Sequence, residues 1–172
     1  APPVLLCFYI YHNLKQMEIS ELFDAIRNQD AAAVGRLLKE NPEWADEKDS
    51  RGSTPLLLAT YYGFEQIAKE VLKHPQNINA QDASGNTALM GVCFKGYNSI
   101  AKLLLKYKAD VNITNFNGAT ALIFAATFKH IEIIKMLLQH GADTTLKDDR
   151  GNTALDHAKM QGASQVIKLL EA

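Results

Sequence analysis

A fixed spacing of 33 residues constrains the fold of this chain more than any other feature. Gly52, Gly85, Gly118 and Gly151 follow one another at steps of 33 residues, and each stands two residues before a threonine. Each threonine opens a similar triplet, of which Thr120-Ala121-Leu122 is one. A period of this length is typical of a solenoid and not of a globular enzyme, because each unit leaves an apolar face that only its neighbours can bury.

Local signals within one unit predict a turn followed by two helices. Asn117-Gly118 is a turn dipeptide, since glycine tolerates the positive φ that a tight turn needs. Thr120 is placed to cap the next helix with its hydroxyl group. We expect a short apolar helix over 121–128 and a second helix over 131–139, with Gly141 as the C-cap glycine.

The combined pattern resembles the ankyrin repeat. It consists of G-x-T-[PA]-L, a short helix, a longer helix that ends in paired apolar residues, and a loop of the form Gly141-Ala142-Asp143. The resemblance implies an all-α ankyrin-repeat solenoid of about five helix-turn-helix units with β-turn or hairpin tips, similar to small free-standing arrays that are common in bacteria. It implies a single repeat domain over 17–172. The expected units are 17–48 (an N-terminal cap repeat), 49–81, 82–114, 115–147 and 148–172 (a C-terminal cap repeat).

Residues 1–16 do not follow the repeat. They contain one short apolar stretch, 4–11, and regular patterning begins near Met17. A signal peptide would carry Lys or Arg before this stretch and a small-residue cleavage site after it, and the sequence has neither. Three interpretations stay open for this extension: a non-native addition, a segment that packs on the first repeat, or a remnant of a targeting sequence.

The sequence departs from the family pattern in ways that affect packing. The family usually has histidine after its T-P-L triplet. Here those places hold Leu57, Met90, Ile123 and Asp156. We therefore expect apolar packing to replace hydrogen bonds there. Lys108 stands where the family has glycine, so it must adopt a strained positive φ or the loop is rebuilt. Gly91 lies within a first helix, and we expect it to permit a close approach of helices.

No arrangement of residues points to catalysis. The sequence has no Gly-rich phosphate loop and no HExxH or GxSxG motif. Ser99 and Lys102 match S-x-x-K, but they fall inside a predicted helix without companion motifs, so we interpret them as helix surface. No two histidines are four residues apart, and Cys7 and Cys93 form no CxxC pair. We predict no catalytic residue, no cofactor, no metal and no enzymatic activity.

Composition narrows the environment in which the chain works. The net charge of −1 gives no electrostatic reason to bind nucleic acid or an anionic membrane. No apolar run approaches the roughly 18 residues of a membrane span. Two cysteines are too few for a disulfide framework and fit a reducing compartment. We expect a cytoplasmic monomer that binds neither nucleic acid nor membrane.

The resemblance also implies where a partner protein binds, because partners of such arrays usually meet a concave face made of turn tips and first helices. Exposed positions of this face carry several aromatic side chains, which bury a large area at low entropic cost. The candidate partner-binding residues are Arg51, Tyr61, Tyr62, Phe94, Lys95, Phe116, Asn117, Thr127, Phe128, Arg150 and Met160. The alternative is that these rings cover neighbouring repeats and belong to the core.

We therefore predict a protein–protein interaction module, with a regulatory or inhibitory subunit of a specific enzyme as the alternative. The charge distribution leaves two interpretations open. Residues 17–50 carry a net charge of −5, and residues 82–147 carry +3. These charges either belong to solvated helix faces or help to orient a partner.

Overall fold

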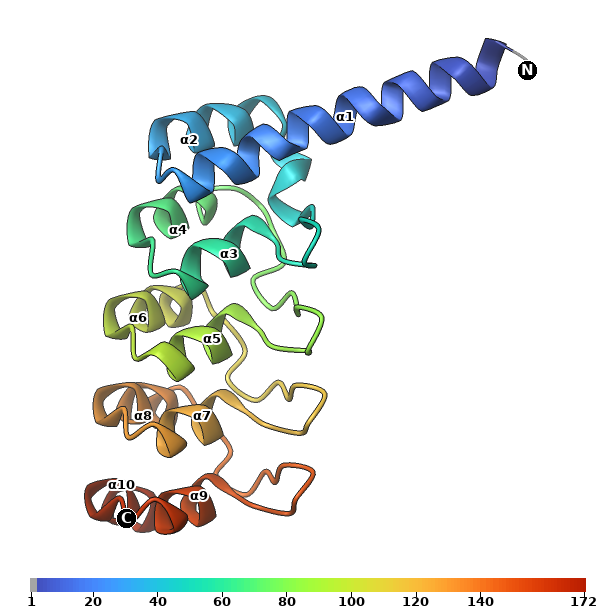
Figure 1. Ribbon diagram of the computed structural model, residues 1–172. Helices are drawn as coiled ribbons and strands as arrows, with labels where there is room; N and C mark the ends of the chain where they lie inside the picture. The colour runs from blue at the N-terminus through green and yellow to red at the C-terminus, as the bar shows by residue number, and fades with distance from the viewer. Residues whose placement is uncertain (1–2) are drawn as a thin grey trace.

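The computed structural model describes residues 3–172 as five helix pairs that stack in sequence order (Figure 1). The elements are α1 (Pro3–Arg27), α2 (Ala31–Glu40), the 3-10 helix η1 (Pro42–Asp46), α3 (Pro55–Tyr61), α4 (Glu65–Val71), α5 (Ala88–Lys95), α6 (Asn98–Lys106), α7 (Ala121–Thr127), α8 (Ile131–Gln139), α9 (Ala154–Met160) and α10 (Ser164–Glu171). Within residues 3–172 there is no strand. The predicted all-α repeat solenoid is confirmed.

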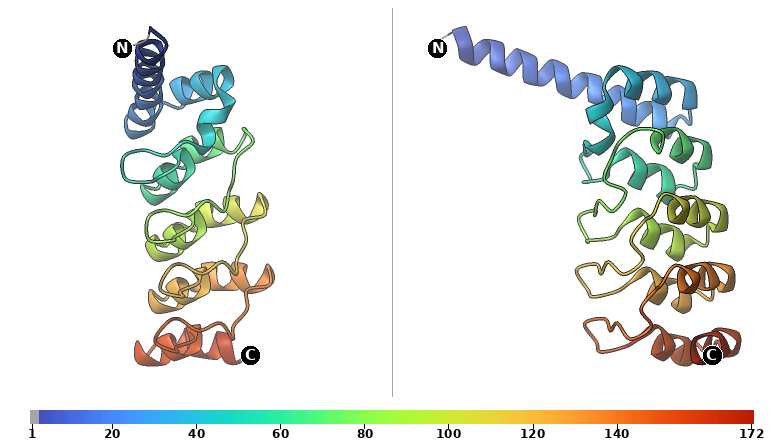
Figure 2. Two further views of the ribbon diagram at one scale, coloured as in Figure 1. Left: turned by 90° about the vertical axis from the view of Figure 1, so that its right-hand side faces the viewer. Right: turned by 180° about the vertical axis from the view of Figure 1, so that it is seen from behind.

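The helices form two columns, as the views in Figure 2 show. The first helices of the pairs (α1, α3, α5, α7 and α9) make one column, and the second helices (α2, α4, α6, α8 and α10) make the other. Four loops, here called tips, extend beside the first helices (Figure 1). The tips are residues 49–53, 82–86, 115–119 and 148–152. The surface made by the tips and the first helices is called the tip face below.

Threonine caps start four of the first helices. The hydroxyl oxygens of Thr54, Thr87, Thr120 and Thr153 each accept a hydrogen bond from the backbone N–H three residues later, at 3.2–3.3 Å. Each such cap stabilises a helix by about 1 kcal/mol. The repeated threonine therefore fixes where each first helix begins, as the sequence predicts for Thr120.

Apolar side chains pack the column of first helices at three of the four places where the family has histidine. Leu57, Met90 and Ile123 are buried, so apolar packing does replace the histidine contacts expected of the family. Asp156, at the fourth of these positions, instead completes a capping box: its carboxylate accepts hydrogen bonds from both the backbone N–H and the hydroxyl group of Thr153.

The helix α1 extends well beyond the stack (Figure 1). It runs without a break through 16–17, and the first buried side chain along it is Ile19. The large apolar side chains between Val4 and Leu14 are exposed, so this stretch does not pack on the first helix pair. Lys15 makes an ion pair with Glu47 at 3.5 Å. Packing, one of the three interpretations of the extension, is therefore not observed over 4–14.

The tips are β-turns, and some of them are joined to one another. In each tip the backbone N–H of the glycine donates to the carbonyl oxygen three residues before it, as in Gly85 to Asp82 at 3.0 Å. Phe116 N–H donates to the Ser84 carbonyl at 3.1 Å, and Asp149 N–H donates to the Asn117 carbonyl at 3.0 Å. In the part of the chain that the structure describes, no backbone hydrogen bond joins tip 49–53 to tip 82–86.

Lys108 adopts a strained positive φ, which is one of the two outcomes expected from the sequence. Its φ is +63°, and it is the second residue after α6. A side chain in this left-handed region costs roughly 1 kcal/mol, and glycine avoids that cost. We expect Lys108→Gly to raise the free energy of unfolding by about 1 kcal/mol, measured by urea denaturation. Lys102→Gly, at an exposed position in the middle of α6, is the control and should lower it by a similar amount. A loss of stability in Lys108→Gly would contradict the assignment of strain.

Candidate functional site

Four aromatic side chains lie exposed at the ends of neighbouring first helices. Tyr61, Tyr62, Phe94 and Phe128 have exposed fractions of 46%, 48%, 41% and 44%. They belong to three successive helix pairs, and the helix ends place them on one side of the column. We call these four residues the aromatic row. Its rings are on the surface and not in the core.

The aromatic row is held in place by contacts between helix pairs. The ring of Phe94 meets that of Phe128 edge to face, with centroids 4.7 Å apart. Lys95 Nζ lies 4.6 Å from the ring centroid of Tyr61 on the preceding pair, a cation–π contact. Tyr61 and Tyr62 also meet edge to face, at 5.3 Å. Because these rings already have fixed neighbours, little side-chain freedom remains to be lost when another molecule covers them.

The remaining candidate residues fall into two groups. Arg51, Phe116, Asn117 and Arg150 are exposed on the tips, and Met160 is exposed at the end of α9. Thr127 differs, because it is half-buried and its hydroxyl group donates to the carbonyl oxygen of Ile123 at 2.8 Å. Its hydroxyl group is thus used within the helix, and part of the side chain remains accessible at the second candidate position of this helix end.

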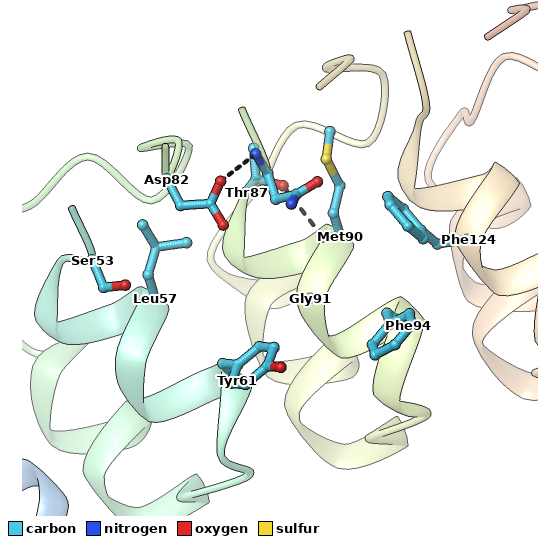
Figure 3. Close-up of a pocket in the computed structure, with 10 residues that line it drawn as sticks. Ser53, Leu57, Tyr61, Asp82, Thr87, Met90, Gly91, Phe94 and Phe124 are labelled. Atoms are coloured by element: carbon cyan, nitrogen blue, oxygen red, sulfur yellow. Dashed lines mark hydrogen bonds between the residues drawn. The ribbon is translucent and has the colours of Figure 1, made fainter. Parts of the chain in front are cut away.

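A hollow of about 240 Å³ opens on the tip face between α3, α5 and α7 (Figure 3). Its walls are mainly apolar. They include Leu57, Tyr61, Met90, Gly91, Phe94 and Phe124. Asp82 and Ser53 lie at the end of the hollow next to the tips. A second hollow of about 460 Å³ lies between α7 and α9 and shares Phe124 with the first.

Gly91 creates the first hollow. A Cβ atom built on Gly91 would meet no atom within 4 Å, so the expected close approach of helices at this residue is wrong. The helices meet instead along the next position, where Val92 and Ala125 are fully buried. At the place of Gly91 the other first helices carry Leu58, Phe124 and His157. The missing side chain therefore leaves space.

The first residue of each tip is Asp or Asn, and its Oδ1 atom makes the same hydrogen bonds in all four tips. The Oδ1 atoms of Asp49, Asp82, Asn115 and Asp148 each accept two backbone N–H groups of their own tip, at 2.8–3.0 Å. The other side-chain polar atom differs. In Asn115 this atom is Nδ2, which donates to Asn86 Oδ1 at 2.9 Å.

The three carboxylates of this series differ in what their second oxygen meets. Arg27 lies 3.2 Å from Oδ2 of Asp49, and His157 Nε2 lies 2.6 Å from Oδ2 of Asp148. Across residues 3–172, no hydrogen bond or ion pair reaches Oδ2 of Asp82. Asp82 was not among the residues that the sequence singled out, and Gly91 was singled out only as a place where helices would approach closely. Comparing the same position in all units, where only one first helix carries glycine, is the signal that could have found them.

The environment of Asp148 predicts that the stability of the fold depends on pH. Burial raises the pKa of this carboxyl group, but hydrogen bonds from Asn152 and His157 outweigh burial and hold the pKa below its usual value. A folded-state pKa below the unfolded one adds stability that is present above about pH 4 and is lost as pH falls through the folded value. We expect Asp148→Asn to be less stable than wild type at pH 7 and closer to it at pH 3. Urea denaturation at both pH values measures this, and an equal difference at both would contradict it.

Within residues 3–172, the other reactive groups do not assemble into a site. Burial raises the pKa of the Cys93 thiol well above its usual range, as expected for a small core residue. Over residues 3–172, no group of three or more His, Cys, Asp or Glu side chains could hold a metal ion. No helix in this same range is long and apolar enough to cross a membrane.

Comparison with known proteins agrees with the repeat architecture. The family model described as ankyrin repeats (3 copies) matches residues 22–115 and 92–171. No curated protein matches the chain. Ankyrin repeats are generally protein–protein interaction modules, and the family is typically non-enzymatic. Because the two matches together cover nearly all of the stacked helix pairs, the chain belongs to the ankyrin-repeat family.

Proposed function

We propose that the tip face binds a segment of a partner protein. The observation that carries this proposal is the aromatic row: Tyr61, Tyr62, Phe94 and Phe128 are exposed across three helix pairs. Exposed aromatic side chains in a contiguous group are typical of interaction sites, because a few such anchors supply most of the binding free energy.

The two hollows support the same surface. Tyr61 and Phe94 line the first, and Thr127, Phe128, Asn117 and Arg150 line the second. Phe124 separates them. A segment of extended chain that lies across α3, α5 and α7 would therefore meet alternating rings and hollows, which is the surface relief that side chains of a bound segment require.

Affinity capture from the native lysate, followed by mass spectrometry, tests the proposal. We expect the wild-type chain to capture a reproducible partner, and we expect Tyr62→Ala with Phe94→Ala to lose it. The control is Tyr107→Ala, which removes an equally exposed ring (43%) from the end of α6, on the other column. Circular dichroism should show the same helicity in all three proteins. Equal capture by the double variant would place the binding surface elsewhere.

We also propose that residues 17–172 form the binding domain and that it acts as a monomer in the cytoplasm. The domain boundary is supported by Ile19, where the core begins along α1. A reducing compartment is supported by two free cysteines, of which Cys7 is exposed. Sedimentation of the chain, with and without residues 1–16, tests the monomer. If the captured partner is an enzyme, its activity with and without the bound chain tests whether binding regulates it.

A further inference from the structure

Among residues 3–172, the carboxylate of Asp82 lacks a side-chain partner that this chain supplies to the equivalent aspartates. Asp49 and Asp148 pair with Arg27 and His157 through Oδ2, as described above. Asp82 holds its tip with Oδ1 in the same way, but within the described residues its Oδ2 has no partner. Asp82 is half-buried, so its carboxylate loses part of its hydration, and a cation beside it would compensate for that loss.

Gly91 stands at the place where the last helix pair carries the partner of its tip aspartate. His157 lies nine residues after Asp148, and Gly91 lies nine residues after Asp82. In the last helix pair this place on the first helix therefore supplies an imidazole to the aspartate. On α5 the same place supplies only the hollow. The hollow therefore opens beside an aspartate to which α5 supplies no partner.

The walls of the hollow suit a long side chain with a charged end. Leu57 and Met90 offer aliphatic surface for methylene groups, and the rings of Tyr61 and Phe94 stand beside them (Figure 3). Such rings attract cations, and Lys95 already contacts Tyr61 in this way. Lys95 ends α5, whereas Asp82 precedes that helix, so the two charges lie at opposite ends of it. The volume equals that of about eight water molecules, enough for one side chain.

We infer that the hollow beside Gly91 receives an arginine or lysine side chain of the partner protein, whose charged end pairs with Oδ2 of Asp82. The inference rests on the proposed function, because it takes the tip face to be the surface that binds a partner segment. The partner is thus a protein that presents a cationic side chain from an exposed segment. Its methylene groups lie against Leu57 and Met90.

Selection from a phage-displayed library of random dodecapeptides on the full-length chain tests this inference. We expect enriched peptides to share one Arg or Lys. We also expect Asp82→Asn to lower the affinity for a synthetic enriched peptide by roughly ten-fold or more. The variant should keep its fold, because Asn115 holds its own tip through Oδ1 in the same way. Glu132→Gln, with the same change of charge on α8 in the other column, is the control and should bind as wild type.

Two further arms sharpen the test. A peptide with citrulline in place of arginine should bind wild type and Asp82→Asn equally, because the charge pair is then absent from both complexes. Gly91→His should lower the affinity for the arginine peptide. The new imidazole would pair with Asp82 as His157 pairs with Asp148.

The outcomes separate this inference from the proposed function. One outcome would overturn the cation site alone. In that outcome the enriched peptides lack a cation and bind Asp82→Asn as tightly as wild type, but they do not bind the variant that combines Tyr62→Ala with Phe94→Ala. Peptides that bind all these variants equally would contradict both proposals. A library that yields no enriched sequence would also count against a cation site at Asp82. So would an equal effect of Asp82→Asn and Glu132→Gln on peptide affinity.

Discussion

Replacement of Leu104 by alanine is expected to lower the free energy of unfolding by about 3 kcal/mol, within a usual range of roughly 2–5. Leu104 lies on α6, in the middle of the stack, and is fully buried. The helix α6 packs against both α4 and α8, so the cavity left by the truncated side chain should not collapse unless one of these helices moves. For a chain of this size the melting temperature should fall by roughly 6–12 °C.

Urea and thermal denaturation, followed by circular dichroism, measure the effect of Leu104→Ala. The matched control is Leu103→Ala, which shortens the preceding and only half-buried side chain on the same helix. The free energy of unfolding should fall clearly less in that variant, because solvent fills the space that the truncated side chain leaves. Equal losses in the two variants would show that α6 does not pack its buried face as described.

The second large effect is expected from Trp44→Ala, at about 3–5 kcal/mol. Trp44 belongs to η1 and is 3% exposed, between the first and second helix pairs. In a stacked array each unit contacts only its neighbours, so damage near one end need not reach the middle. We therefore expect amide protons of α2 and of the buried part of α1 to lose protection while those of α6 and α8 keep it.

Hydrogen exchange resolved by mass spectrometry distinguishes these two variants. Leu104→Ala should reduce protection over the whole stack, and Trp44→Ala only in its first pair. If Trp44→Ala instead melted all five pairs together, the array would be one cooperative unit. The exposed ring of Tyr107 provides the reference, since its truncation should change stability by no more than about 0.5 kcal/mol.

The stacked fold is predictable from the sequence because its signals are local and repeated. Thr120 caps α7, and α8 spans Ile131–Gln139, the range expected from apolar periodicity. Gly141 has φ of +82°, as a C-cap glycine requires. The helix α7 ends at Thr127, one residue earlier than predicted. Each of these features depends only on residues within a few positions, and the repeat supplies four copies of the same evidence.

The hollow is less predictable, because it depends on contacts between units. Glycine in a helix is compatible with a close approach and with an empty space, and only the surroundings of Gly91 decide between them. The partners of the tip aspartates are no more evident, since Arg27 lies 22 residues before Asp49. The residues 1–16 also lack repeated evidence, so their sequence left several interpretations open.

The uneven linkage of the tips gives the array an uneven stiffness. A Cβ built on Gly85 or Gly118 would lie 2.7 or 3.0 Å from a backbone nitrogen of the next tip, but one on Gly52 would lie 3.8 Å from that of Ala83. The joint between tips 49–53 and 82–86 is thus wider and lacks the backbone bond found at the next two joints. We therefore expect the solenoid to bend more easily at this joint than at the next two. Tyr61 and Phe94 lie on the two helix pairs that meet there, so a side chain bound between them should change the curvature of the solenoid at this joint.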